Sequence, residues 1–168
     1  ASSLTFVPTI ATMAALPTPV DGQPVMVTSQ TVGGLWVWRQ IDMTANVALD
    51  SAKALYAAST TISVSTGAWV RVVMDNRFLA QWWGVSAIRT DNQVALNTAL
   101  QVIPDGAELV LPLGEYSCTG TVFSRTDRAV HVRAAARHKS HLFVSDAAAS
   151  YNLMQIMGSG STVKSIAL

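Results

Sequence analysis

The chain has 168 residues, half of them apolar, so it is long enough to bury the hydrophobic core of one domain or of two small ones. Only 12% of the residues are charged, compared with about a quarter in an ordinary soluble domain, and we expect partner chains to cover part of the surface. Eleven Lys and Arg residues against ten Asp and Glu residues leave a net charge of +1, which excludes a strong field that would attract nucleic acid or an anionic membrane.

The two ends of the chain and its single cysteine exclude several further classes of protein. Residues 1–20 are uncharged but contain three prolines and no basic start, a pattern that predicts neither a signal peptide nor a membrane span there. Cys118 has no second cysteine with which to form an intrachain disulfide or a zinc cluster, so stability must come from packing and association. Alternation over residues 163–168 stops without a turn, and we expect the chain to be part of a longer protein.

The first forty residues predict a short helix followed by a hairpin. Residues 9–16 favour a helix with Thr9 as its N-cap, and prolines end it. Two extended runs, residues 24–28 and 35–40, are separated by a Gly-Gly pair and predict an antiparallel hairpin. In the second run Trp36 and Trp38 share one face, which we expect to be covered.

Residues 42–73 predict the rest of a compact α+β module. Asp42 or Thr44 can cap a helix within residues 42–59, on which one face carries Ala48, Ala52, Leu55 and Tyr56. Residues 60–64 alternate in β-branched side chains and predict a strand, and residues 69–73 predict another after the turn at Gly67.

A capping box marks the start of the best-supported helix. The Thr90 hydroxyl can accept a hydrogen bond from the Gln93 amide while the Gln93 side chain reaches back to the Thr90 amide. Apolar residues then recur at helical spacing until Pro104, which predicts a helix over residues 91–103 whose buried face carries Leu96, Ala99, Leu100 and Ile103.

Beyond that helix the pattern changes to short strands bounded by turn residues. We expect strands at residues 108–111, 116–122, 129–133, 141–144, 153–157 and 162–167, and a short helix at 146–151. Such spacing suits a sandwich, a barrel or a parallel solenoid. No Asn-Gly or Asp-Gly pair separates the last four strands, and this favours a coil that winds onward over hairpins that double back.

Several segments resemble phage tailspikes and tail fibres that contain a pectate-lyase-like right-handed β-helix. The matching segments are residues 81–85 (QWWGV), 90–100 (TDNQVALNTAL) and 106–116 (GAELVLPLGEY), the last ending in the family's Pro-x-Gly-x-Tyr pattern. Residues 9–17, 21–27, 36–38 and 67–72 are similar to the small module that precedes the β-helix in such proteins. Residues 86–89 depart from the family's usual Gly-Asp-Gly turn, and residues 42–59 form a longer connection than usual.

The resemblance implies a mostly β protein in two domains. Residues 1–80 would be a small N-terminal α+β module for tail attachment, and residues 81–168 a capping helix with the first coils of a right-handed parallel β-helix. The open end of such a stack must be covered, since it exposes apolar interior and unpaired strand edges. We expect the cap to consist of Thr90, Gln93, Leu96, Leu100 and Ile103, and the junction to consist of Trp82, Trp83 and Gly84.

No catalytic, cofactor or metal site is assembled by sequence pattern. A glycosidase needs two facing carboxyl groups about 5–10 Å apart, but the carboxylates after residue 81 occupy helix starts and turns, or, like Glu108, have no evident partner. His138 and His141 lack a third ligand, and Cys118 is best explained as a buried core residue. The one basic cluster, opposed locally by Asp127, is either a solvated face or a grip for an acidic surface or polysaccharide; it consists of Arg125, Arg128, Arg133, Arg137 and Lys139.

These observations leave three hypotheses for function. The first is a structural virion protein of the phage tail, a homotrimer whose N-terminal module binds a tail or baseplate protein and whose absent C-terminal part binds bacterial surface polysaccharide. The second is a polysaccharide-degrading tailspike with its active site beyond residue 168, because the same fold carries lyases and hydrolases. The third is a stand-alone adaptor onto which another fibre docks. None of the three requires a cofactor, nucleic acid or insertion into a membrane.

Overall fold

The computed structural model describes residues 3–135, 140–144, 154–156, 158–164 and 166–167. The chain divides into two compact units, Ala1–Val73 and Met74–Leu168. The division falls earlier than the boundary expected after residue 80, because residues 77–79 form a strand that pairs within the second unit. No helix among the described residues has the length and apolar character needed to cross a membrane.

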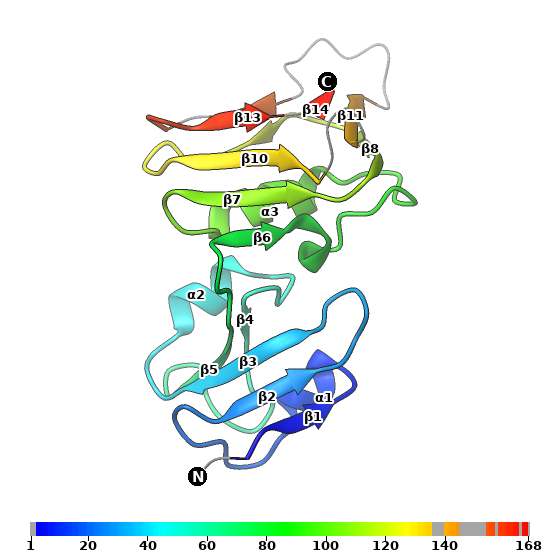
Figure 1. The fold of residues 1–168 in the computed structure, drawn as a ribbon. Coiled ribbons are helices and arrows are strands. Elements are labelled where there is room, and N and C mark those ends of the chain that lie inside the picture. Colours follow the sequence, from blue (N-terminus) through cyan, green and yellow to red (C-terminus); the bar gives the residue numbers. More distant parts are fainter. Residues whose placement is uncertain (1–2, 136–139, 145–153, 157, 165, 168) are drawn as a thin grey trace. The chain divides into compact units, whose positions relative to one another are not determined.

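The first unit is a five-stranded sheet with two short helices (Figure 1). In chain order the elements are β1 (Thr5–Val7), α1 (Ile10–Ala14), β2 (Pro24–Val27), β3 (Gly34–Arg39), α2 (Thr44–Leu49), β4 (Tyr56–Ala57) and β5 (Ala68–Arg71). The sheet order is β1-β2-β3-β5-β4, with β1 parallel to β2 and all other neighbours antiparallel. The predicted hairpin is therefore confirmed as β2 and β3. The predicted N-cap is confirmed too, since the Thr9 hydroxyl accepts a hydrogen bond from the Thr12 amide.

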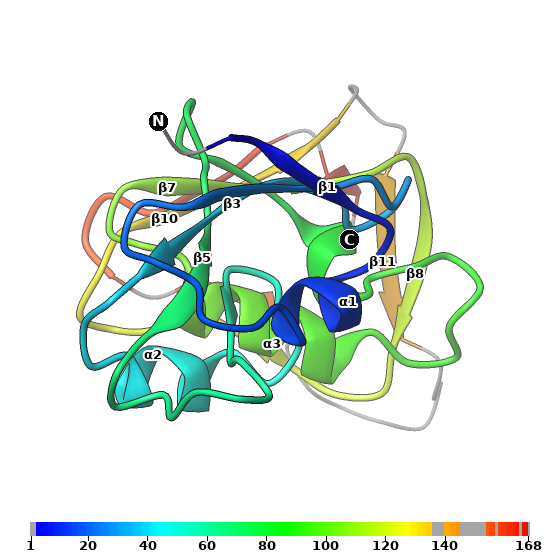
Figure 2. The same ribbon diagram turned by 90° about the horizontal axis from the view of Figure 1, so that it is seen from below.

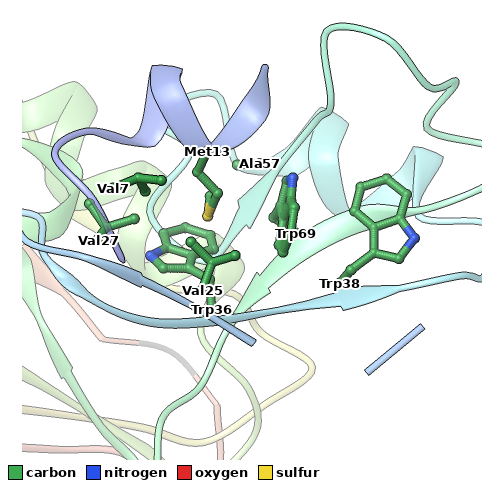
Figure 3. Close-up of a cluster of buried hydrophobic side chains, with 8 residues drawn as sticks. All are labelled: Val7, Met13, Val25, Val27, Trp36, Trp38, Ala57 and Trp69. Atoms are coloured by element: carbon green, nitrogen blue, oxygen red, sulfur yellow. The ribbon is translucent and has the colours of Figure 1, made fainter. Parts of the chain in front are cut away.

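Tryptophans fill the core of the first unit between the sheet and α1 (Figure 3). Trp36, Trp38 and Trp69 are each at most 1% exposed, and the rings of Trp38 and Trp69 meet edge to face with centroids 5.3 Å apart. The covered face predicted for Trp36 and Trp38 is confirmed. Burying aromatic rings of this size, with the edge-to-face contact, is a large part of what stabilises a small domain.

Arg71 is a buried cation that the sequence pattern did not single out. It lies opposite Trp36 in the β3–β5 register, with its guanidinium carbon 4.5 Å from the centre of the indole ring. Its nitrogens donate to the carbonyls of Ala54, Gly33 and Val32, at 2.5, 2.6 and 2.8 Å. Burial lowers the pKa of Arg71 to about 10, and the charge of Asp50 acts in the opposite direction. The side chain therefore ties the β2–β3 loop and the segment before β4 to the sheet.

Two predicted elements of the first unit are wrong. The helix expected within residues 42–59 is limited to α2, so Ala52, Leu55 and Tyr56 lie beyond it. The buried Asp50 carboxylate accepts hydrogen bonds from the Leu55 and Tyr56 amides, and Tyr56 begins β4. Residues 60–64 are bends and turns rather than a strand. The Ser59 hydroxyl accepts the Thr61 and Ile62 amides, and such local bonds compete with strand pairing.

The described residues of the second unit form three parallel sheets, and the chain passes through these sheets in turn. It opens with β6 (Arg77–Leu79), the 3₁₀ helix η1 (Ala80–Trp83) and α3 (Gln93–Val102), and the remaining strands are β7 (Ala107–Leu111), β8 (Gly114–Cys118), β9 (Val122–Phe123), β10 (Val130–Ala134), β11 (Ser140–Val144), β12 (Met154–Gln155), β13 (Thr162–Lys164) and β14 (Ile166–Ala167). The sheets are β13-β10-β7-β6, β14-β11-β8 and β12-β9, and every pairing among the residues described in this unit is parallel.

From β7 onward, each strand pairs with the third strand after it, so the chain winds onward as predicted and does not double back in hairpins. Figure 1 shows β6, β7, β10 and β13 stacked side by side. Viewed along that stack, β8 and β11 run along an adjacent side of the unit and α3 lies opposite β7 (Figure 2). The expected strands at residues 116–122 and 162–167 are each divided in two, and the expected helix at 146–151 lies outside the described residues.

Candidate functional site

The candidate site is the first edge of the three parallel sheets, where the chain enters the second unit. β6 pairs with β7 and continues directly into η1, whose last residue, Trp83, is 3% exposed. Gly84 ends η1 with φ 81°, a left-handed conformation that favours glycine, and its carbonyl accepts a hydrogen bond from Arg89 at 3.0 Å. Trp82 is half-buried and packs edge-on against Phe78, with ring centroids 6.4 Å apart. The residues expected at the junction therefore form one tight turn from strand to helix.

Asn92 joins the loop before α3 to the edge of β8. It is fully buried, and its backbone amide and side-chain amide both donate to the Ser117 carbonyl, at 2.8 and 3.2 Å. Its side-chain oxygen accepts the Ser86 amide at 2.9 Å. A strand edge in this position would otherwise present unpaired backbone groups. Asn92 therefore takes the place of a neighbouring strand for the last part of β8.

Polar side chains of α3 close the edge of β9 in the same way. Asn97 accepts the Phe123 amide at 2.9 Å, and the side-chain amide of Gln93 donates to the Thr121 carbonyl at 3.2 Å. Gly120 makes this approach possible, because a Cβ there would lie 2.5 Å from the Gln93 side chain. The apolar face of the same helix packs inward, with Leu96, Leu100 and Ile103 at most 1% exposed.

The predicted capping box at Thr90 is wrong. The helix begins at Gln93 rather than at residue 91, Asn92 is the N-cap residue, and Thr90 supplies no cap hydrogen bond. Asp91 takes that role: its carboxylate accepts the Gln93 amide at 2.9 Å and also binds the amide and hydroxyl of Thr119, at 3.0 and 2.7 Å. Gln93 does not reach back to Thr90 because its side chain is held by the Thr121 carbonyl.

Charged side chains gather on the outer face of the β6–β7–β10 sheet. The sequence suggested no partner for Glu108. Its carboxylate accepts two hydrogen bonds from the Arg133 guanidinium, at 2.8 and 3.2 Å, and forms an ion pair with Arg77 at 3.2 Å. The parallel register explains the cluster: Arg77 is the partner of Glu108 on β6, and Arg133 lies two residues beyond the partner of Glu108 on β10, on the same face of the sheet. The sequence predicted strands at residues 108–111 and 129–133, but it gave no signal for the register that brings these charges together.

The basic cluster expected from the sequence separates into two groups. Arg125 and Arg128 lie beside Asp127, at 2.5 and 3.9 Å, whereas Arg133 belongs to the Glu108 cluster; Arg137 and Lys139 lie outside the described residues. Asp105 accepts the Ala129 amide at 2.7 Å and so closes a turn. Glu115 is exposed, and Asp146 lies outside the described residues.

Cysteine and histidine show no metal-binding arrangement in the described part of the chain. Within it, no group of three or more His, Cys, Asp or Glu side chains is placed to hold a metal ion. Cys118 is buried, as expected, and burial together with the nearby Asp91 charge raises its thiol pKa to about 11. His138 lies outside the described residues, and of His141 only the backbone, in β11, is described.

The turn between β7 and β8 accounts for the Pro-x-Gly-x-Tyr pattern. The Tyr116 hydroxyl donates to the carbonyls of Pro112 and Leu113, at 2.8 and 3.1 Å. These bonds stabilise the turn between β7 and β8. Gly114 has φ 145°, a conformation that other residues rarely adopt. Burial raises the pKa of the Tyr116 hydroxyl above its ordinary value.

Comparison with known proteins relates this arrangement to phage tailspikes. No protein-family model and no curated protein matches the sequence. The tailspike protein gp49 of Acinetobacter baumannii bacteriophage Fri1, a capsular polysaccharide depolymerase, matches 95% of this chain and 32% of its own, with a TM-score of 0.61 and 16% identity. The chain is similar in fold to phage tailspike proteins over about 95% of its length.

Two further tailspikes show the same likeness. Tailspike protein 2 of Escherichia coli O157:H7 bacteriophage CAB120 matches 95% of this chain and 20% of its own, with a TM-score of 0.59 and 15% identity. The tailspike protein of Acinetobacter phage vB_ApiP_P1 matches 96% of this chain and 28% of its own, with a TM-score of 0.54 and 14% identity. The chain thus spans a third or less of the length of these proteins, and at such identities the likeness concerns the fold.

Proposed function

We propose that the chain is the N-terminal part of a phage tailspike or tail fibre, a structural virion protein of the phage tail that serves attachment to the host. The observation that carries the proposal is the rotation of parallel strands among three sheets whose first edge is closed by α3, in a chain that shares its fold with tailspikes. In this proposal the second unit begins a right-handed, pectate-lyase-like parallel β-helix, in line with the strong preference for right-handed parallel crossovers.

The cap belongs to this proposal because a stack of coils needs one closed end. Sheet by sheet, β6 covers the edge of β7, Asn92 covers β8, and Asn97 with Gln93 covers β9. Leu96, Leu100 and Ile103 fill the space inside that end. Gln93, Asn97, Leu96 and Leu100 are residues of α3, which supports this helix as the lid of the stack.

The first unit is the proposed attachment module, and its sheet offers a surface for partners. On the face opposite the tryptophan core, cross-strand partners form apolar rows: Phe6, Met26 and Leu35 in one, and Pro24, Val37, Val70 and Tyr56 in the other. Phe6 is 65% exposed. Contiguous apolar surface of this kind is typical of protein contacts, which supports a homotrimer bound to a tail or baseplate protein.

Sedimentation of the full 168-residue chain tests the trimer. We expect a stable trimer at micromolar concentration, which Phe6→Glu dissociates because it places a charge on the apolar face. Val20→Glu is the matched control: Val20 is 59% exposed but lies outside the strands of the sheet, so the trimer should persist. A wild-type chain that sediments as a monomer would contradict this part of the proposal.

Attachment to the tail needs a test on phage particles. With the full-length spike carrying a gold label at residue 1, electron microscopy should place the label where the spike meets the tail. Gold at the outer tip of the spike would contradict the proposed orientation. In this proposal, bacterial surface polysaccharide is bound by the part of the spike that follows residue 168.

A polysaccharide-degrading spike is the second candidate, favoured by the fold shared with a capsular polysaccharide depolymerase. In the described part of this chain Asp91, Asp105, Glu108 and Asp127 are held by backbone amides or arginines. We therefore expect the 168-residue chain to release no reducing ends from capsule and a longer chain to do so. A stand-alone adaptor is distinguished by the mass of the protein in the virion.

A further inference from the structure

The sheet of the first unit has one open edge and one closed edge. β1 and β4 are its two outer strands, and Figure 1 shows β1 beside β2 at one side of the sheet. An outer strand directs every second amide and carbonyl away from the sheet, where another strand can bind them. The two edges differ in what occupies these groups.

The edge at β4 is closed by Asp50. The Leu55 carbonyl accepts the Arg71 amide of β5 at 2.8 Å, so the backbone groups of the next residue, Tyr56, point away from the sheet. The Tyr56 amide is bound by the buried Asp50 carboxylate at 2.9 Å. Because β4 is also only two residues long, this edge offers little to a further strand.

The edge at β1 is open at Phe6. The Val7 carbonyl accepts the Thr28 amide at 2.9 Å, which directs the polar backbone groups of Val7 toward β2 and those of Phe6 away from it. Among the residues that the structure describes, none forms a hydrogen bond with the Phe6 amide or carbonyl. Residues 3–9 carry no charge, although charged side chains are a common protection of sheet edges.

The side chains beside this edge suit an extended segment with apolar residues. Phe6 is 65% exposed, and Leu4, two residues earlier, is 42% exposed. Residues two apart on an extended chain lie on the same face, and the partner of Phe6 on β2 is Met26. A strand added at β1 therefore gains backbone hydrogen bonds from Phe6 and apolar contacts for its alternate side chains.

Symmetry argues against a second copy of this chain as the occupant. Pairing of β1 with β1 is isologous and closes as a dimer, so it cannot build the proposed trimer. Pairing of β1 with β4 of the next copy meets the edge that Asp50 closes. We propose that the free edge of β1 binds one extended segment of a different protein, with alternate apolar side chains, and that this segment extends the sheet by one strand.

This inference rests on the proposed function, since it takes the partner to be the tail or baseplate protein that holds the first unit. It adds the mode of binding, which is strand addition at a named edge with one segment for each chain. The trimer contact proposed above uses side chains on the face of the sheet, whereas this partner uses backbone groups at its edge.

Hydrogen exchange of the full 168-residue chain, free and bound to tail particles assembled without the spike, tests the edge. In the free chain we expect the Phe6 amide to exchange rapidly and the Val7 amide slowly, because the register bonds only Val7 to β2. Binding to the tails should slow exchange at Phe6 at least about tenfold. A Phe6 amide that is already protected in the free chain, or that stays unprotected in the bound chain, overturns this inference while the attachment function stands. A chain that does not bind the tails overturns both.

The variant Phe6→Pro isolates the backbone contribution. Proline removes the outward amide but no hydrogen bond to β2, and proline is tolerated on edge strands. We expect tail binding to weaken roughly tenfold, with sedimentation and the exchange of the β2 and β3 amides unchanged. Phe6→Val is the matched control: it keeps the amide and an apolar side chain, so it should bind the tails as the wild type does. Equal binding by the two variants, or loss of the oligomer in Phe6→Pro alone, overturns the proposal.

Discussion

Asn92 is the single residue on which the closed edge depends most. It is fully buried and connects the Ser86 amide to the Ser117 carbonyl through the two ends of one side-chain amide. No charged residue can satisfy both partners, because one is a donor and the other an acceptor. The residue type is therefore dictated by the geometry of the two backbone groups that it joins.

We predict that Asn92→Ala lowers the free energy of unfolding of the second unit by about 2 kcal/mol, since it leaves the partly buried Ser86 amide without its partner and removes a buried bond to the Ser117 carbonyl. Asn92→Asp keeps the acceptor for Ser86 but loses the donor to Ser117, and should also destabilise. Hydrogen exchange of the β7 and β10 amides measures the effect. Asn46→Ala in α2, where no side-chain hydrogen bond is present among the described residues, is the control and should change stability by less than about 0.5 kcal/mol. Equal effects of the two alanine variants would show that Asn92 has no special role.

Asp91 makes the entry to α3 sensitive to acid. Burial acts to raise the pKa of its carboxyl, but hydrogen bonds from Gln93 and Thr119 outweigh it and hold the pKa below 3.8. The unfolded chain therefore takes up a proton at higher pH than the folded chain, so this stabilisation is present above about pH 4 and is lost as pH falls through the folded pKa.

The corresponding prediction uses Asp91→Asn. At pH 7 the substitution should cost about 1 kcal/mol, because it replaces a charged acceptor of three hydrogen bonds by a neutral one. The difference from wild type should shrink when urea unfolding is repeated from pH 5 down to pH 3. Glu115→Gln, at an exposed position on β8, is the control. A difference that stays constant with pH would contradict the assigned role of the carboxylate.

At the scale of elements, α3 is held by both of its faces. Its apolar side chains point into the unit, and its amide side chains bind the loop and strand around residues 121–123. Buried leucine contributes roughly 1.5–3 kcal/mol each, so the inner face provides most of the attachment energy.

We predict that Leu100→Asp costs more than about 4 kcal/mol, the lost burial plus the penalty for an unpaired carboxylate in the interior. Val94→Asp is the matched aliphatic control on the same helix, and Val94 is 70% exposed. A carboxylate in the first turn of a helix is neutral or stabilising by up to about 1 kcal/mol. Urea unfolding and limited proteolysis should separate the two variants clearly, and similar stability in both would exclude α3 as a buried lid.

Elements marked by a local sequence pattern were predictable, and features that depend on one particular hydrogen-bond partner were not. Helical spacing located α3 and its inner residues, alternation located β3, and the turn residues that bound short runs located β7 and β10. The helix expected through residue 56 failed because the buried Asp50 binds backbone amides beyond it. Helix propensity carries no information about such a contact, which is made by one buried carboxylate.

The candidate site also contains residues that the sequence predicts and residues that it does not. Leu96, Leu100 and Ile103 follow from periodicity, whereas Asn92 and Asn97 bind groups 25 and 26 residues away. Thr90 satisfies the capping pattern in sequence, yet Asp91 accepts the Gln93 amide instead, and the same carboxylate also binds Thr119. The Glu108 cluster likewise required the register between β7 and β10, which sequence does not define.

At the scale of the whole molecule, each unit has its own core. The tryptophan cluster of the first unit draws all of its buried members from residues 7–69. The buried residues of the second unit surround α3, β7, β8 and β10. Separate cores predict separate unfolding transitions, since each unit can lose its packing while the other keeps its hydrogen bonds.

Trp69→Ala tests this separation. Trp69 is fully buried against Trp38, and removing such a ring costs about 3–5 kcal/mol, enough to unfold a small unit. We expect the amides of β2, β3 and β5 to lose protection from hydrogen exchange while those of β7, β10 and β11 keep it. Leu100→Asp should give the reverse pattern. If Trp69→Ala also exposes the β7 amides, the two units unfold as one, and the attachment module cannot be exchanged without the parallel sheets that follow it.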